Sequence, residues 1–175
     1  MSSSGSPAPA REQVSQFLDE YYSEMESNDP ARYSRYYADD IRLTFGNEEV
    51  IVGREAVVEA FDSMLSRFAS LHHDLVSVWP QADGVVIFES VGTWLLRGGE
   101  SVSIPACSVF TISGGVFTEL RIYVDNAPVF AALEREGAEH FRPPSPEGVL
   151  SGEYVHELSV FPYDQFRLRS RLSIP

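Results

Sequence analysis

The stretch SVSIPACSVFTISGGVFTELRIYVDNAPVF, residues 101–130, decides the fold of this chain. Residues alternate in polarity on both sides of Ser113-Gly114-Gly115, which predicts two long strands joined by a tight hairpin turn. In the second strand one face would carry Phe117, Glu119, Arg121, Tyr123 and Asp125. Asp125 then lies where this strand ends and a short helix begins, so its carboxylate is expected at the mouth of whatever the sheet encloses.

Composition limits the classes of function. A chain of 175 residues fits one domain with a sizeable core, and 43% hydrophobic with 22% charged residues is ordinary for a globular protein. The formal net charge of -13 argues against binding to nucleic acids or anionic membranes, since both need clustered cations. The charge therefore argues against these two classes of partner.

Other classes are excluded by residues that are rare or missing. The single cysteine, Cys107, rules out an internal disulfide and favours the cytoplasm. The chain has no lysine, which excludes a lysine Schiff base, and no spacing typical of metal ligands, so we expect neither a metal nor a cofactor. Residues 1–10, MSSSGSPAPA, lack the features of a signal peptide and are expected to form a disordered lead-in.

The first half of the chain predicts three helices and a small hairpin. Residues 11–27 carry apolar side chains at helical spacing, and Asp29-Pro30 is a strong start signal for a short second helix over 30–37. A strand over 41–45 turns at Gly46-Asn47-Glu48-Glu49 into a short strand that ends at Val52. A third helix is expected after Gly53.

The second half predicts a sheet. Four strand-like stretches follow, over 72–79, 85–96, 101–113 and 116–125, with glycine-containing turns between them, and a last short helix is expected over 128–136. Helices followed by long antiparallel strands indicate an α+β domain over residues 11–136. Because the helices can cover only one face, we expect a cone-shaped α+β barrel with an apolar interior.

The C-terminal part differs in character. After Gly137 comes the proline-rich segment Phe141-Arg142-Pro143-Pro144-Ser145-Pro146, followed by an aromatic-rich remainder. We expect residues 137–175 to pack on the domain or on a partner chain, as a lid or as a dimer arm.

Four stretches resemble the nuclear transport factor 2-like superfamily, in particular its SnoaL-like polyketide cyclase and ketosteroid isomerase-like branch. They are DPARYSRYYADD (29–40), GREA (53–56), LHHDL (71–75) and RIYVD (121–125), within a likeness that covers about residues 14–133. The resemblance implies a cone-shaped fold, a pocket for a small molecule and, commonly, a homodimer formed through the open face of the sheet.

The resemblance also implies roles for two residues. Asp125 matches the catalytic aspartate of SnoaL-like cyclases, and a partly buried carboxylate is suited to proton transfer. The alternative is that Asp125 caps the following helix. Tyr21 falls where ketosteroid isomerases keep an oxyanion-hole tyrosine, and its place on the apolar helix stripe directs it inward; the alternative is a core tyrosine with an ordinary partner.

Two further positions are compared with the family. His73 shares strand parity with Leu75 and Trp79 and is expected to face inward, where a similar histidine acts in scytalone dehydratases; a structural histidine is the alternative. Cys107 matches the second oxyanion donor of the isomerases, and Phe45 stands at their base aspartate, and both departures argue against ketosteroid isomerisation. Cys107 is also readily interpreted as a small buried hydrophobe.

An epoxide hydrolase of this fold needs an arginine and an aspartate at positions that hold Ser90 and Gly92 here, which argues against its water-activating relay. The expected substrate-binding walls are Phe17, Phe88, Ser90, Trp94, Cys107 and Tyr123. Glu26 and the pair Asp39-Asp40 are expected to be solvated surface groups.

These observations predict a cofactor-free cyclase or isomerase of secondary metabolism that acts on a bulky apolar carbonyl compound. Asp125 would move the proton, and Tyr21 with His73 would stabilise the enolate oxygen. A dehydratase, an epoxide hydrolase or a non-catalytic binding or dimerisation module are the alternatives.

Overall fold

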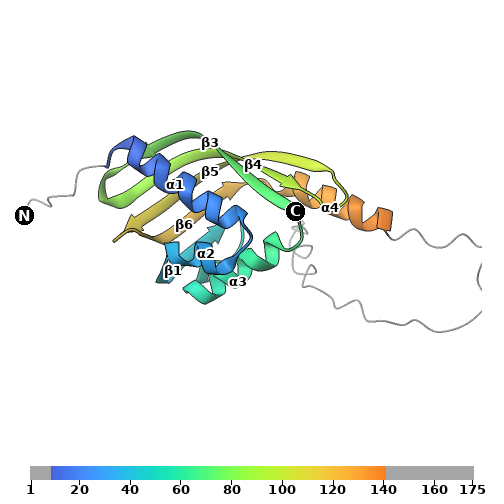
Figure 1. Ribbon diagram of the computed structural model, residues 1–175, viewed down its shortest axis with the longest axis horizontal. Helices are drawn as coiled ribbons and strands as arrows, with labels where there is room; N and C mark the ends of the chain where they lie inside the picture. Colours follow the sequence, from blue (N-terminus) through green and yellow to red (C-terminus); the bar gives the residue numbers. More distant parts are fainter. Residues whose placement is uncertain (1–8, 141–175) are drawn as a thin grey trace, which may run out of the picture. The chain divides into compact units, whose positions relative to one another are not determined.

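Six strands form one curved sheet in the computed structural model, which describes residues 9–140 (Figure 1). Their order across the sheet is β2-β1-β6-β5-β4-β3. All neighbours are antiparallel except β1 and β6, which are parallel. The strands are β1 (Tyr37–Phe45), β2 (Ile51–Val52), β3 (Ser70–Pro80), β4 (Val85–Leu95), β5 (Ser101–Ser113) and β6 (Val116–Val124).

The helices pack on one face of this sheet. Helix α1 (Arg11–Glu26) lies against β3, and α3 (Arg54–Leu65) lies against β1 (Figure 1). Between them are the single turn α2 (Pro30–Tyr33) and the 3-10 turn η1 (Ser34–Tyr36), and a second 3-10 turn, η2 (Ala82–Gly84), joins β3 to β4. The α+β class and its two layers are as the sequence predicts.

Two details of the expected architecture are corrected. The sheet is cone-like but does not close into a barrel, because β2 and β3 are edge strands without a common partner. The sheet is also mixed rather than wholly antiparallel, since β1 pairs with β6 in parallel. The long hairpin of β5 and β6 is as predicted, with Gly114 and Gly115 at φ of 60° and 81°, the left-handed values that a tight two-residue turn requires.

Helix α1 forms because its apolar side chains repeat at helical spacing and all face the sheet. The buried side chains are Val14, Leu18, Tyr21, Tyr22 and Met25. Opposite them, on the concave face of the sheet, Phe110 packs edge-to-face on both Phe88 and Phe117. The core is therefore built largely of aromatic rings between α1 and the middle strands.

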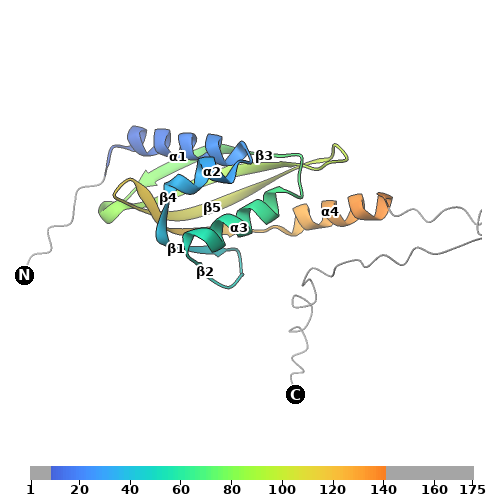
Figure 2. The same ribbon diagram turned by 60° about the horizontal axis from the view of Figure 1, so that its bottom comes forward.

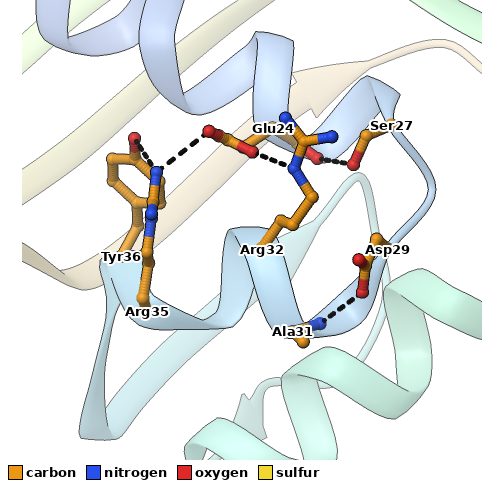
Figure 3. A network of polar contacts seen from close by, with 7 residues as sticks. All are labelled: Glu24, Ser27, Asp29, Ala31, Arg32, Arg35 and Tyr36. Carbon is orange, nitrogen blue, oxygen red and sulfur yellow. Dashed lines mark hydrogen bonds and ion pairs between the residues drawn. The ribbon is translucent and has the colours of Figure 1, made fainter.

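The junction between α1 and the second helix is fixed by polar contacts (Figure 3). Glu24 forms ion pairs with Arg32 and with Arg35, the latter at 2.9 Å. Asp29 accepts a hydrogen bond of 3.0 Å from the Ala31 backbone N–H, so it caps α2 as predicted. The second helix is shorter than expected because the chain is already in strand β1 from Tyr37 on, and Asp39 and Asp40 lie in that strand rather than in a turn.

Two β-bulges change which residues face inward. The first bulge is in β6. Glu119 pairs with Thr111 of β5 and Phe117 pairs with Ile112, which leaves Thr118 as an extra residue of β6. Before the bulge the odd-numbered Phe117 faces inward. After the bulge the inward residues are even-numbered: Leu120, Ile122 and Val124. The predicted shared face of Phe117 and Tyr123 is wrong for this reason.

A similar bulge in β3 leaves Val76 unpaired between Leu75 and Ser77. His73 and Leu75 face the helices as predicted, but Trp79 beyond the bulge is 44% exposed on the other face. His73 therefore shares its face with Leu75 but not with Trp79, so the predicted common face of these residues is correct only up to the bulge.

Helix α4 (Ala127–His140) extends from the end of β6 (Figure 2). It is longer than predicted and passes Gly137, and Arg135 pairs with Glu100 of the β4–β5 hairpin at 2.5 Å. Most of the expected lid or dimer arm lies beyond residue 140, outside the described residues. Most of the expected N-terminal lead-in, residues 1–8, is also outside them.

The face of the sheet away from the helices is open. Large apolar side chains are exposed there, among them Val76, Trp79 and Tyr123. The homodimer that the family resemblance implies through this face stays a prediction. Within residues 9–140 no helix has both the length and the apolar character needed to cross a membrane.

Candidate functional site

A cavity lies between the helices and the concave face of the sheet. It holds about 540 Å³ of atom-free space, counting its open mouth. The wall is mainly apolar, with polar groups from α1, β3, β4 and β5. The lining residues are Tyr21, Tyr22, Met25, Phe45, Phe61, Met64, Leu71, His73, Ser90, Gly92, Trp94, Ile104, Ala106, Ser108, Phe110, Ile122, Val124 and Asn126.

His73 lies on the cavity wall and is held by Glu26 at the end of α1. Its backbone N–H donates to Glu26 Oε1 at 2.6 Å, and its ring Nδ1 lies 3.2 Å from the same oxygen. The exposed His72 uses Nδ1 to reach the other oxygen of Glu26 at 3.0 Å. One carboxylate thus bridges helix α1 and the first residues of β3.

The charge of Glu26 follows from these contacts. Desolvation, the largest single influence, raises its pKa, but the hydrogen bonds from His73 and His72 together bring the pKa below its ordinary value. Glu26 is therefore ionised at neutral pH and can only accept hydrogen bonds. The expectation that Glu26 is merely a solvated surface group is wrong: its side chain is 19% exposed and ties two elements together.

An ionised Glu26 also fixes the tautomer of His73. Because the carboxylate accepts only, the proton of neutral His73 belongs on Nδ1, and Nε2 carries the lone pair. His73 pairs with Gly92 of β4, and its Cδ2 lies 3.9 Å from the position of a Cβ built on Gly92. The Cδ2 side of the ring thus lies beside Gly92, at the wall of the cavity that His73 lines.

The aromatic neighbours of His73 restrict its ring. Tyr22 stacks on it with ring centroids 4.1 Å apart and an interplanar angle of 22°. Burial is the main reason that the pKa of Tyr22 lies well above its ordinary value, and a side-chain hydrogen bond with Ser90 opposes this increase. Tyr22 is therefore a neutral phenol that holds His73 in one orientation.

Tyr21 reaches the cavity from α1 as predicted. Its side chain is 1% exposed, and its hydroxyl lies 2.7 Å from that of Tyr37. Desolvation raises the pKa of both tyrosines, and the pKa of Tyr21 is raised well above its usual range, so neither loses its proton near neutral pH. When Tyr37 donates to Tyr21, the Tyr21 O–H is free to donate into the cavity.

Trp94 presents an unpaired donor at the same wall. Its side chain is 6% exposed, and Nε1 is buried without a hydrogen-bond partner. A buried N–H without an acceptor costs about 1–3 kcal/mol. Trp94 and Ser90 line the cavity as predicted from the alternation of β4.

The structure does not bring Asp125 to this cavity. Its side chain is exposed, and Oδ1 accepts a hydrogen bond of 3.0 Å from the Ala127 backbone N–H at the start of α4. This is the helix-capping alternative. The next residue, Asn126, lines the cavity instead.

Four expected wall residues lie elsewhere. Cys107 and Tyr123 pair across β5 and β6 and are exposed on the open face, Tyr123 by 50%. Phe88 is fully buried in the aromatic core and packs on Phe110 behind the cavity. Phe17 packs on Tyr36 and Phe117 toward the other end of α1. Their placement on the cavity wall is thus corrected.

Sequence reasoning missed Ser108 and Asn126 and assigned Glu26 to the surface. The hydrogen bonds of Glu26 join residues 46 and 47 positions apart, and no local pattern announces such a contact. Ser108 could have been found, because it shares parity with Phe110 in a strand whose apolar face was recognisable. Among the described residues no group of three or more side chains is arranged to hold a metal ion.

The comparisons with known proteins agree with this fold. The family model of the SnoaL-like domain matches residues 18–120. No curated protein matches the sequence. Several solved structures share the fold at low sequence identity, and three of them illustrate its range of names.

A protein from Jannaschia sp. CCS1, described as a SnoaL-like polyketide cyclase, has 17% identity and a TM-score of 0.61 over 73% of this chain and 96% of its own. A protein with a ketosteroid isomerase-like fold from Catenulispora acidiphila DSM 44928 has 15% identity and a TM-score of 0.59 over 66% of this chain and 90% of its own. An epoxide hydrolase from M. tuberculosis has 17% identity and a TM-score of 0.59 over 75% and 97%.

Identities this low establish the fold and not the reaction. The family model, however, covers more than half of the chain and runs from Leu18 in α1 through β4 and β5 to Leu120 in β6. This chain belongs to the SnoaL-like domain family.

Proposed function

We propose that this protein is an acid–base enzyme, a cyclase or isomerase of secondary metabolism, that moves a proton on an apolar carbonyl compound bound in the cavity. One observation carries the proposal: His73, with Nδ1 held by the ionised Glu26, lines an apolar, aromatic-walled cavity beside Gly92. Membership of the SnoaL-like domain family, which includes cyclases and isomerases, supports the class of reaction.

The chemistry would proceed in two proton steps. Nε2 of His73 removes a proton from the carbon next to the carbonyl group, and the C–H electron pair forms the enolate. Tyr21 donates a hydrogen bond to the developing oxyanion in a site shielded from water. The imidazolium then returns its proton, either to another carbon in an isomerisation or to the alkoxide formed when the enolate closes a ring.

Glu26 acts on His73 rather than on the substrate. Its negative charge favours the imidazolium that forms in the first step, and its hydrogen bonds keep the ring in one tautomer. The proposal departs from the sequence-based hypothesis in one respect: His73 takes the part of the base that was expected for Asp125, which caps α4.

The test does not require the natural substrate. Purified protein is incubated with cyclic ketones in D₂O, and uptake of deuterium next to the carbonyl is followed by mass spectrometry. Catalysed exchange that His73→Gln abolishes and His72→Gln retains would support the proposal, since both histidines bond Glu26 but only His73 lines the cavity.

Two other outcomes would contradict it. Incorporation of ¹⁸O from labelled water into an epoxide such as limonene oxide, without exchange of any ketone, would favour a hydrolase. That outcome is not expected, because Ser90 and Gly92 stand at the cavity wall where the family resemblance asks for charged residues. Binding of ketones with no turnover of either kind would favour a binding module.

A further inference from the structure

The described residues contain three buried polar atoms without a hydrogen-bond partner: Tyr33 Oη, Trp94 Nε1 and Arg121 Nε. Tyr33 packs on Tyr37 and is absent from the cavity wall, and Arg121 lies 3.4 Å from Glu119 in an ion pair. Trp94 is the one of the three that lines the cavity. Its unpaired N–H is thus a donor for which the protein itself offers no acceptor.

The residue beside this donor, Gly92, has no side chain. A Cβ built on Gly92 would lie 3.5 Å from Trp94 Nε1 and 3.9 Å from His73 Cδ2. Gly92 and Trp94 are two residues apart on one face of β4, and His73 pairs directly with Gly92. The donor N–H and the proposed base therefore border the same small volume above Gly92.

The glycine is not required by its backbone. Its φ lies outside the left-handed region, and the atoms nearest to an added Cβ are at ordinary contact distances, 3.5 to 3.9 Å. Alanine would fit at this position in a regular strand. The absence of a side chain there thus leaves room beside Nε1 without being needed for the fold.

We propose that Trp94 Nε1 and the space over Gly92 form the subsite for a carbonyl oxygen of the substrate. This inference rests on the proposed function, because it places that oxygen beside His73. The substrate class is an apolar cyclic ketone whose oxygen is directed to the β4 wall. Trp94 then acts as a specificity-determining residue, which favours a ketone over the hydrocarbon of the same shape.

The experiment compares 1-indanone with indane, which has the same rings but no oxygen. The chain has two tryptophans, so a ¹⁵N-labelled sample gives two indole N–H resonances, and Trp94→Phe assigns them. Trp79 is 44% exposed on the open face and serves as the internal reference. We expect 1-indanone to move the Trp94 resonance downfield while indane does not, with the Trp79 resonance unchanged.

Binding affinities provide the second measurement. Trp94→Phe keeps an aromatic ring but removes the donor, and Gly92→Ala keeps the donor but fills the space before it. Each variant should weaken 1-indanone binding about three- to tenfold, the value of one neutral hydrogen bond, and leave indane binding within about twofold. The wild-type preference for the ketone should be lost in both.

Three results would overturn the subsite. The first is that saturating 1-indanone shifts the Trp94 resonance no more than indane does. The second is that Trp94→Phe keeps the wild-type preference for the ketone, and the third is that 1-indanone does not bind up to its solubility limit. The subsite and the proposed function fail separately. His73→Gln should keep the ketone preference while losing exchange in D₂O. If His73→Gln loses exchange but 1-indanone does not shift the Trp94 resonance, the subsite alone is wrong. If 1-indanone shifts the Trp94 resonance but His73→Gln still catalyses exchange, His73 is not the base.

Discussion

Two adjacent rows of residues cross the sheet, one facing the cavity and the other facing the open side of the sheet. One row joins Ser90, Ala106 and Val124 on β4, β5 and β6, and all three line the cavity. The next row joins Glu89, Cys107 and Tyr123, which point to the open face. A single step along each strand separates the two rows, because successive side chains alternate between faces.

The difference teaches that the site depends on strand parity more than on residue type. Cys107 and Tyr123 are chemically suitable for a pocket, yet they lie outside it, whereas Ala106 and Val124 supply only apolar surface and lie inside. The predictions below test this division between the cavity face and the open face of the sheet.

The largest effect is expected at the start of β3, where His73 faces the cavity and His72 faces solvent. His73→Gln should lower the rate of ketone exchange by about 10² to 10⁴, the usual contribution of general acid–base catalysis. His72→Gln should change it by about twofold at most. Equal losses in the two variants, measured as deuterium uptake at fixed ketone concentration, would mean that the division does not govern activity.

The second prediction compares the two faces in stability. Phe88 is fully buried between Tyr22 and Phe110, and Phe88→Ala should lower the free energy of unfolding by about 3–5 kcal/mol. Cys107→Ala on the open face should change it by less than about 0.5 kcal/mol. Urea unfolding measures both values. A cost above about 2 kcal/mol for Cys107→Ala would show that the open face is covered, for example by a second copy of the chain.

The third prediction concerns Tyr21, which adds a donor to the cavity from α1. Tyr21→Phe should reduce exchange by about 10² to 10³ with little change in ketone affinity, because the hydrogen bond strengthens as charge develops on the oxygen. Tyr37→Phe is the matched control, since Tyr37 contacts Tyr21 from behind and is absent from the cavity wall. It should cost less. The reverse order would assign the donor role to Tyr37.

The smallest effect is a dependence of stability on pH at the edge of the site. The hydrogen bond with Glu26 raises the pKa of His72, so the stabilisation from this contact is present below the unfolded pKa of about 6.5 and is lost as pH rises through the folded pKa. Glu26, with its lowered pKa, contributes stability above its unfolded pKa of about 4.3 and loses it as pH falls.

The contact is thus strongest between about pH 4.3 and 6.5. Because His72 is exposed, its part should stay below about 1 kcal/mol. Thermal unfolding of the wild type should show a slightly lower midpoint at pH 8 than at pH 6. His72→Gln should flatten this slope, and an undiminished slope in that variant would assign it to another group.

The sequence predicts the elements well because its signals are local. Turn glycines, the Asp29-Pro30 start and the helical stripe of α1 each act within a few residues, and the structure has the corresponding elements. In β4 the alternation from Val86 to Trp94 is unbroken and pairs with β5 without a shift, so the inward position of Ser90 and Trp94 could be predicted.

The site is less predictable because it depends on contacts between distant residues. Whether Glu26 is a surface group or the partner of His73 is decided by how α1 lies on β3, and the residues around Glu26 do not encode that arrangement. The predicted inward position of Tyr123 is wrong for a related reason. Phe117 is a correct anchor for the first part of β6, but the extra residue Thr118 inverts the alternation after it.

The bulge at Thr118 has a consequence for how the family can vary in length. Removal of this residue would turn β6 into a regular strand in which Phe117, Leu120, Ile122 and Val124 still point inward, so the chain can shorten there with its inner surface intact. β4 has no extra residue of this kind, since its eleven residues pair with β5 in one continuous register. A one-residue deletion in the middle of β4 would exchange inner and outer side chains beyond it. Insertions and deletions among homologues are therefore expected to accumulate in β6 and to be rare in β4.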